Sequence, residues 1–570
     1  MQLTSTVSAN SDGGVSSSAS EGEWQLGTDT ELPIAPPPVE PEQPRNRSLE
    51  RLERPLHILT AEHCGWLLLI SYAVFSRLAL LGARPLDANE ASRALASLSD
   101  YGSNANVIPQ PGWVNVITVA LSALGGPSDW SVRIVTALCG LMLIVVAFGL
   151  RRYIGRAGGL ALALLLTLSP GFTYYARANA PEMPAALMAL LTLYGFCVLA
   201  ERPSPTRAAW LGIAIGLMSA TPPDGRITAL SFGIALGLIG LYCLITRQHA
   251  VLNIGVWFRR YRGLLLIVVL ATVAAWIASQ FLTNVPTYVA TGSLSIQGDG
   301  GGLIKTSRDY LPALALDEFL IVLAAMVGMV AVLSARRPLR SMLAGWVALW
   351  TLFSLVMTLA LLAPDTANLP LILLPLAVLG ALGVEWLHHG SAWPVARTII
   401  GALAVLTLYV QILTNFVYYA PDASEASWNR HANLYWSAMT TTIQTRVYCR
   451  RAMAGITAAD ATVYFNIEAP ALRWYLRELR PVKDPTISAV TVGPSPIDGS
   501  GNGAKHSDEL RRFDFDYAMT WPLTWSGLTP ASALSYIFAG EARANPIAAS
   551  VNITARGSNP PASMAGDSGE

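Results

Sequence analysis

The sequence predicts an α-helical polytopic membrane protein with about 11 transmembrane helices, followed by a small extracytoplasmic α/β domain. Of its 570 residues, 52% are apolar and only 13% are charged, about half the charged fraction of a soluble globular domain. Apolar stretches long enough, or nearly so, to cross a roughly 30 Å hydrocarbon layer recur between about residues 64 and 418. Lipid is therefore the main solvent that we expect for this chain.

Charge and metal-ligating residue types exclude several classes of function. The formal net charge of +1 gives no overall attraction to nucleic acid. The five cysteines form no CxxC pair, and the seven histidines are scattered apart from His388 and His389. We expect no nucleic-acid partner, no zinc or redox motif and no histidine-rich metal centre.

Residues 1–55 predict a disordered cytoplasmic tail. They are rich in Ser, Gly, Pro and Glu and cannot bury enough apolar surface to offset the chain entropy. The first strongly apolar run begins only near Cys64, too late for a signal peptide. Four arginines precede it and favour a cytoplasmic N-terminus: Arg45, Arg47, Arg51 and Arg54.

Residues 56–418 predict the transmembrane domain, in which a long first external loop covers 84–130. The predicted spans are approximately 64–83, 131–150, 158–172, 183–200, 208–221, 227–246, 263–283, 316–334, 341–362, 369–388 and 396–418. One set of alternate loops holds 13 Lys and Arg in 45 residues, and the other holds 6 in 105. The positive-inside rule places the first set in the cytoplasm. We therefore expect a multi-pass plasma membrane protein in which the chain after the last span is extracytoplasmic.

Residues 419–555 predict the extracytoplasmic α/β domain, and 556–570 a second disordered tail. Residues 461–466 have the pattern of a strand, and 488–492 and 513–520 are further strand candidates. Pro470 suits a first helical turn, and the residues from Leu472 to Leu479 have apolar side chains at helical spacing.

The start of the first external loop holds two acids. Four apolar residues fall on one stripe, which predicts an amphipathic helix along the membrane surface: Ala91, Ala94, Leu95 and Leu98. Asp87 and Glu90 stand three residues apart at its first turn. Such a pair can hold a divalent cation, Mg²⁺ or Mn²⁺, or deprotonate an acceptor hydroxyl. The same spacing is also a capping-box pattern that needs no function.

The third predicted span ends in a second segment, which runs from Ser169-Pro170 through Tyr174-Tyr175-Ala176-Arg177 to Glu182. Together with Asp87 and Glu90 it resembles the polytopic glycosyltransferases of the GT-C superfamily, in particular their protein mannosyltransferase and aminoarabinose transferase-like branch. A WYLR element, Trp474-Tyr475-Leu476-Arg477, is similar to one in archaeal and bacterial relatives. The two aromatic residues are also typical of a helix that packs on strands.

This resemblance implies a membrane glycosyltransferase that moves a sugar from a polyprenyl-phosphate donor to a protein, lipid or glycan acceptor with inversion. Asp87 or Glu90 would be the base and a tentative metal ligand, and Glu182 a supporting residue. Many relatives have Asp directly before Glu, where this chain has Asn89. Because Asn is not a base at neutral pH, the alternative is a catalytically inactive subunit that binds a partner through its external domain.

Three arginines are candidates for binding the donor phosphate. Arg177 ends its span and could hold phosphate with its planar guanidinium, or extend to the interface. Arg77 lies in an apolar run, where an unpaired charge is unfavourable. Arg226 is a third candidate, although it could pair with Asp224 in a tight turn.

Tyr174 and Tyr175 fit either an aromatic interface belt or sugar stacking. A transporter is a third class of function, but neither repeated halves nor mid-span acid pairs are evident in the sequence.

Overall fold

The computed structural model describes residues 61–97, 112–221, 224–245, 254–281, 318–334, 338–361, 369–390, 393–412, 440–441, 443–454, 456, 461–467, 469–494, 510–520 and 547–556. The chain divides into two compact units, residues 1–64 and 65–570. Of the first unit only the start of helix α2 is described, and all contacts reported below lie within the second. The predicted tail over 1–55 lies outside the described residues, as does all but residue 556 of the tail over 556–570.

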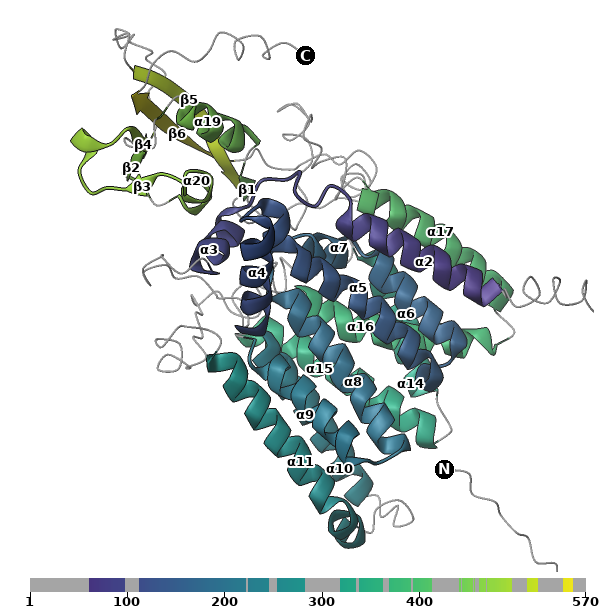
Figure 1. Ribbon diagram of the computed structural model, residues 1–570. Helices are drawn as coiled ribbons and strands as arrows, with labels where there is room; N and C mark the ends of the chain where they lie inside the picture. Colours follow the sequence, from purple (N-terminus) through teal and green to yellow (C-terminus); the bar gives the residue numbers. More distant parts are fainter. Residues whose placement is uncertain are drawn as a thin grey trace, which may run out of the picture. The chain divides into compact units, whose positions relative to one another are not determined.

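Helices make up the membrane domain (Figure 1). They are α2 (Ala61–Leu78), α3 (Ala88–Ser97), α4 (Gly112–Gly125), α5 (Asp129–Ile154), α6 (Arg156–Leu168), α7 (Pro170–Ala176), α8 (Glu182–Glu201), α9 (Pro205–Ser219), α10 (Asp224–Ile245), α11 (Ile254–Phe281), α14 (Phe319–Leu333), α15 (Pro338–Leu361), α16 (Leu369–His388) and α17 (Trp393–Ile412). Each of the predicted spans overlaps one of these helices, or the α6 and α7 pair, and the ends of some predicted spans, such as 413–418, lie outside the described residues.

Six of these helices are long and apolar enough to cross a membrane, or up to seven if a bent pair counts as one span, within the described part of the chain. The predicted fold class, a helical polytopic membrane protein with a small α/β domain, is confirmed. The number of 11 spans is not, because several of the predicted ranges form helices too short or too polar to meet the same test.

The core of the bundle gathers around α5, α6, α8 and α16, with α9 and α11 side by side and α14 against α16 (Figure 1). An aromatic cluster joins α8, α10 and α15. The Phe232 ring lies 4.5 Å from Trp346 and 5.2 Å from Trp350, and Phe196 lies 5.4 Å from Trp346. Most core side chains are apolar, so burial of apolar surface stabilises the bundle.

The third predicted span breaks into α6 and α7, which are bent by 63°. Pro170 begins α7, and the Ser169 hydroxyl accepts a hydrogen bond from the Phe172 N–H. The Glu318 carboxylate accepts from the Ser169 hydroxyl and from the Gly171 N–H, each at 2.7 Å. A buried carboxylate at the N-terminus of a helix is favoured by the helix dipole, and it satisfies donors that the break would leave unpaired.

The C-terminal domain, which the sequence predicts to be external and which we call the external domain, contains a six-stranded sheet with the order β1-β5-β6-β4-β2-β3. Its strands are β1 (Thr440–Thr441), β2 (Thr462–Phe465), β3 (Arg480–Pro481), β4 (Val490–Pro494), β5 (Leu510–Thr520) and β6 (Ile547–Arg556). Strand β2 pairs in parallel with β3 and β4, and the other pairs are antiparallel. The predicted strands correspond to β2, β4 and β5, whereas β6, which joins the two halves of the sheet, was not predicted.

Helices α19 (Ile443–Met453) and α20 (Pro470–Tyr475) pack with this sheet. Helix α20 lies where a helix was predicted, with Pro470 at its first position, but it ends at Tyr475 instead of continuing to Leu479. Its Leu472 is fully buried against Val463, Val490 and Ile553 of the strands. One side of α20 therefore anchors in the external domain, and the other is available for the membrane domain.

Candidate functional site

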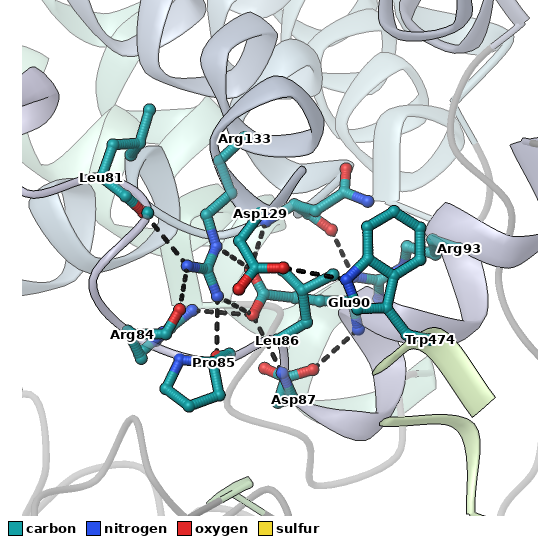
Figure 2. Close-up of polar contacts among 12 residues, drawn as sticks. Leu81, Arg84, Pro85, Leu86, Asp87, Glu90, Arg93, Asp129, Arg133 and Trp474 are labelled. Atoms are coloured by element: carbon teal, nitrogen blue, oxygen red, sulfur yellow. Dashed lines mark hydrogen bonds and ion pairs between the residues drawn. The ribbon is translucent and has the colours of Figure 1, made fainter. Parts of the chain in front are cut away.

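Asp87 and Glu90 are joined by the first turn of α3. The Glu90 N–H donates to Asp87 Oδ1 at 2.7 Å, and the Asp87 N–H donates to Glu90 Oε2 at 3.1 Å (Figure 2). This is a reciprocal capping box, with Asp87 at the N-cap position. The spacing of Asp87 and Glu90 therefore does form a capping box, and its two hydrogen bonds fix the positions of both carboxylates.

Glu90 is the centre of a buried ion-pair network. Arg133 of α5 donates from Nε to Oε1 at 2.8 Å and from Nη2 to Oε2 at 2.6 Å, and Arg84 Nη2 donates to Oε2 at 2.9 Å. The Asn179 N–H donates to Oε1 at 2.7 Å. The Glu90 side chain is 1% exposed. With the Asp87 N–H, five donors surround a carboxylate that offers about four lone-pair sites.

Arg133 also fixes the path of the loop that leads to α3 (Figure 2). Its Nη1 donates to the carbonyl oxygens of Leu81 at 3.1 Å and Arg84 at 2.7 Å, and its Nη2 donates to the Pro85 carbonyl at 2.9 Å. The planar guanidinium thus binds the Glu90 carboxylate on one edge and three backbone carbonyls on others. A single buried side chain from α5 determines the entry into α3.

The two neighbouring carboxylates have opposite shifts in pKa. Burial alone would raise the pKa of Glu90, but the charges of Arg133 and Arg84 and the hydrogen bonds lower it to about 2. For Asp87, burial and the neighbouring Glu90 charge raise the pKa to about 6. Glu90 therefore stays ionised at neutral pH, whereas Asp87 titrates near the range in which a general base works well.

The geometry does not fit a metal ion at Glu90. Both of its oxygens accept hydrogen bonds, and two arginines contact it, so a divalent cation would have to displace donors and approach like charges. Among the described residues there is no group of three or more His, Cys, Asp or Glu side chains that could hold a metal ion. A metal site at Asp87 and Glu90 stays a prediction.

Two predicted phosphate-binding arginines contact backbone carbonyls. Arg177 Nη1 donates to the carbonyls of Ser76 at 2.9 Å and Ala79 at 2.6 Å, and Nη2 donates to that of Leu80 at 3.3 Å. These groups end α2, where the helix dipole favours a cation. Arg77 is fully buried, and its Nη2 donates to the Leu166 carbonyl at 2.8 Å.

The other predicted site residues lie in several places. Arg226 is partly buried in the first turn of α10, while the side chain of Asp224 lies outside the described residues. Glu182 is buried at the start of α8. Tyr174 and Tyr175 are buried on α7 with ring centroids 5.1 Å apart.

One contact and one exposed side chain lie close to Asp87 and Glu90. The Arg84 guanidinium lies 5.1 Å from the centre of the Tyr174 ring, within the range of a cation–π contact. Asn89 is exposed, so its side chain points away from the ion-pair network.

Sequence reasoning missed Arg133 and Asp129. Arg133 stands near the start of the predicted span 131–150, and a charge inside an apolar run is a signal for a buried partner. Asp129 is the first residue of α5 and accepts three hydrogen bonds from the external domain. Nothing local in the sequence distinguishes it from an ordinary helix N-terminal acid.

Comparison with known proteins places this arrangement in a wider context. The sequence model of a family described as dolichyl-phosphate-mannose-protein mannosyltransferase matches residues 109–277, a region that begins after α3 and its two acids. No curated protein matches the sequence.

Solved structures match a larger part of the chain. ArnT from Cupriavidus metallidurans bound to undecaprenyl phosphate is similar with a TM-score of 0.52 and 15% identity, over 75% of this chain and 92% of that one. The apo state of ArnT gives 0.51 and 16% identity, over 74% and 86%. The S. cerevisiae protein O-mannosyltransferase Pmt1-Pmt2 complex bound to the sugar donor gives 0.32 and 15%, over 43% and 35%. The predicted resemblance is confirmed, and the fold of the chain is similar to that of ArnT.

Proposed function

We propose that the protein is an inverting glycosyltransferase that moves a sugar from a polyprenyl phosphate to an extracytoplasmic acceptor. The fold similarity to ArnT, whose structure contains undecaprenyl phosphate, supports a donor of this chemical class. The excess of basic residues in alternate loops supports a cytoplasmic N-terminus and an extracytoplasmic C-terminal domain. The acceptor is a protein, lipid or glycan hydroxyl on that side.

In the proposed reaction, Asp87 is the general base. The acceptor oxygen attacks the anomeric carbon from the face opposite the phosphate, so a new C–O bond forms while the bond to the phosphate oxygen breaks. The phosphate leaves with the electron pair of that bond, and the acceptor proton goes to Asp87. The Glu90 N–H donates a hydrogen bond to Asp87 Oδ1. In the proposed reaction, the other carboxylate oxygen, Oδ2, takes the proton.

Cationic side chains would neutralise the leaving phosphate. Of the three predicted arginines, Arg177 fits this role best because it is only partly buried and its Nη2 has a long 3.3 Å bond to a carbonyl. Arg226 is a further candidate at the start of α10. Arg77 is fully buried, so a phosphate could reach it only if the contact between α2 and α6 opened.

The observation that carries this proposal is the contrast in pKa at the first turn of α3. Glu90 is held ionised by Arg133 and Arg84, and its charge together with burial raises the pKa of Asp87 to about 6. A base whose pKa lies near the working pH is largely deprotonated and still has a high affinity for a proton. In this proposal Glu90 positions and tunes Asp87 rather than taking the proton itself.

Replacement of Asp87 tests the proposal. The purified protein in lipid nanodiscs is given undecaprenyl-phosphate-linked mannose, arabinose or aminoarabinose with a membrane extract as acceptor, and release of undecaprenyl phosphate is measured. Asp87→Asn keeps an acceptor for the Glu90 N–H and removes the base, so turnover should fall roughly 10²- to 10⁴-fold.

The matched control is Asp514→Asn, which changes an exposed carboxylate on β5. It should leave turnover as in the wild type. Unchanged turnover in Asp87→Asn would exclude Asp87 as the base.

A second candidate is a catalytically inactive subunit with the same fold. The capping box and the buried ion pair account for both acids without any chemistry, and this observation favours it. The same assay separates the two candidates, because the subunit would neither bind nor turn over any donor and would purify with a partner at a fixed ratio.

A further inference from the structure

Three of the polar contacts between the external domain and the membrane domain meet at one carboxylate, that of Asp129 at the start of α5. Trp474 Nε1 donates to Oδ1 at 2.8 Å, and the Tyr475 hydroxyl donates to Oδ2 at 2.9 Å. Arg446 of α19 donates from Nη2 to Oδ2 at 2.6 Å. Three side chains far along the sequence thus converge on an acid that Figure 2 shows beside the Glu90 network.

One of these contacts continues to the candidate site. The Tyr475 hydroxyl accepts a hydrogen bond from the Leu86 N–H at 2.8 Å, and Leu86 directly precedes Asp87. Leu86 is fully buried and packs in a small cluster with Trp474 and Ala471 of α20. The residue before the proposed base is therefore held by the external domain through both a hydrogen bond and apolar contact.

The chemistry of the hydroxyl fixes the direction of both hydrogen bonds. A phenol has one proton to donate, and since the Leu86 N–H can only donate, the hydroxyl must give its proton to Asp129. Burial and the Asp129 charge raise the pKa of Tyr475 far above its usual value, so the hydroxyl keeps this proton. Asp129 therefore orients the hydroxyl that holds Leu86.

The loop between α2 and α3 is thus held by the two domains in complementary ways. Arg133 of the membrane domain binds the carbonyls of Leu81, Arg84 and Pro85, while the external domain binds the next N–H, that of Leu86. Arg446 adds a contact to the Gly82 carbonyl at 3.0 Å. Neither domain alone satisfies all the polar backbone groups that determine the direction of Asp87.

We propose that Tyr475 is a positioning residue, through which the external domain, by way of Asp129 and Leu86, sets the orientation of Asp87 in the reaction centre. This inference rests on the proposed function and deepens it. It makes the C-terminal domain part of the active site rather than only a module for binding a partner. It assigns Trp474 and Arg446 the task of keeping Asp129 in place.

Tyr475→Phe tests the inference because it removes only the hydroxyl. The Leu86 N–H then loses its partner in a buried place. We expect kcat to fall about tenfold with little change in KM, because donor contacts stay intact. Water that reaches Asp87 would lower its raised pKa, so the acid limb of the pH profile of kcat/KM should move to lower pH.

A second readout does not depend on activity. Amide hydrogen exchange of peptides from 81–97 should be faster in Tyr475→Phe than in the wild type, while peptides from 461–494 keep their protection. Asp129→Asn should produce the same pattern more weakly, because one amide oxygen is still an acceptor. Tyr464→Phe, on strand β2 of the same domain, is the matched control and should change neither readout.

The outcomes separate this inference from the proposed function. Unchanged exchange over 81–97 in Tyr475→Phe would overturn the positioning role, even if kcat fell. A change in KM alone would also overturn it, because that result places Tyr475 at a substrate. If the wild-type protein turned over no donor at all, the proposed function would fail, while the exchange experiment would still decide whether the external domain holds this loop.

Discussion

Two acidic centres lie near the start of α3, and they are bound in different ways. Glu90 pairs with Arg133 where the two side chains are 1% and 0% exposed, and all its partners come from the membrane domain and its first loop. Asp129 pairs with Arg446 where the side chains are 11% and 21% exposed, and its partners come from the external domain. The first centre builds the site and the second attaches a domain to it.

This difference teaches that the two arginines are not equivalent. Removing Arg133 takes a charged partner and two hydrogen bonds from the fully buried Glu90, which keeps Arg84, and it also takes a donor from three loop carbonyls in the same buried place. In contrast, a partly exposed carboxylate that keeps two other donors is still satisfied. The difference between the two centres can be tested by replacing Arg133 and Arg446 one at a time and comparing the free energies of unfolding.

The largest effect is expected for Arg133→Ala. It should lower the free energy of unfolding by about 3–5 kcal/mol, because Glu90 loses two hydrogen bonds and the loop carbonyls lose three. Arg446→Ala should lower it by only about 1 kcal/mol, because Trp474 and Tyr475 still donate to Asp129. Denaturant titration in detergent micelles measures both.

Arg512→Ala serves as the control for these variants. It removes an exposed ion pair with Asp514, which contributes about 0–1 kcal/mol. Equal losses for Arg133→Ala and Arg446→Ala would contradict the distinction between the two centres.

A smaller effect is expected in the pH dependence of stability. It tests the opposite pKa shifts of Glu90 and Asp87 in the first turn of α3. The pKa of Glu90 is lowered to about 2 from roughly 4.3 in the unfolded chain, so its contribution is present above about pH 4.3 and is lost as the pH falls toward 2. The pKa of Asp87 is raised to about 6 from roughly 3.9. Its protonated form is the favoured one in the fold, so stability is lost as the pH rises from about 3.9 through 6.

The unfolding midpoint at pH 4 to 7 measures the second of these effects. Asp87→Asn should lose less stability over this range than the wild type, because the group that titrates is gone. Asp514→Asn should keep the wild-type slope. A steeper slope in Asp87→Asn would mean that Asp87 is stabilised in its charged form, contrary to its burial beside Glu90.

The sequence predicted the helical bundle well because a hydrocarbon solvent imposes long apolar runs on the chain. It predicted β2, β4 and β5 from their apolar content, but not β6. Residues 547–556 combine small and polar side chains such as Ala549, Ser550 and Asn552. Strand β6 owes its place between β4 and β5 to pairing with both, which is a tertiary effect that local propensity does not contain.

The candidate site was predictable only in part. The spacing of Asp87 and Glu90 indicated a shared helical turn, and the structure has it. The partner of Glu90 is Arg133, 43 residues away, and the contact depends on how α5 packs beside the loop. Likewise, Trp474 and Tyr475 had the pattern of core residues, yet their polar atoms reach 345 and 346 residues back to Asp129.

The smallest expected effect concerns Asn89, the residue directly before Glu90. The residue is exposed in the first turn of α3, so Asn89→Asp gains from the helix dipole and loses from repulsion by the neighbouring acids. We expect stability to change by less than about 0.5 kcal/mol. The new negative charge should raise the pKa of Asp87 further and move the acid limb of the turnover profile to higher pH, whereas the neutral Asn89→Gln should move nothing. A limb that moved to lower pH, or a protein that lost much of its stability, would mean that the Asn89 amide supports the site by contact, and the exposed position would then no longer explain why this chain tolerates Asn there.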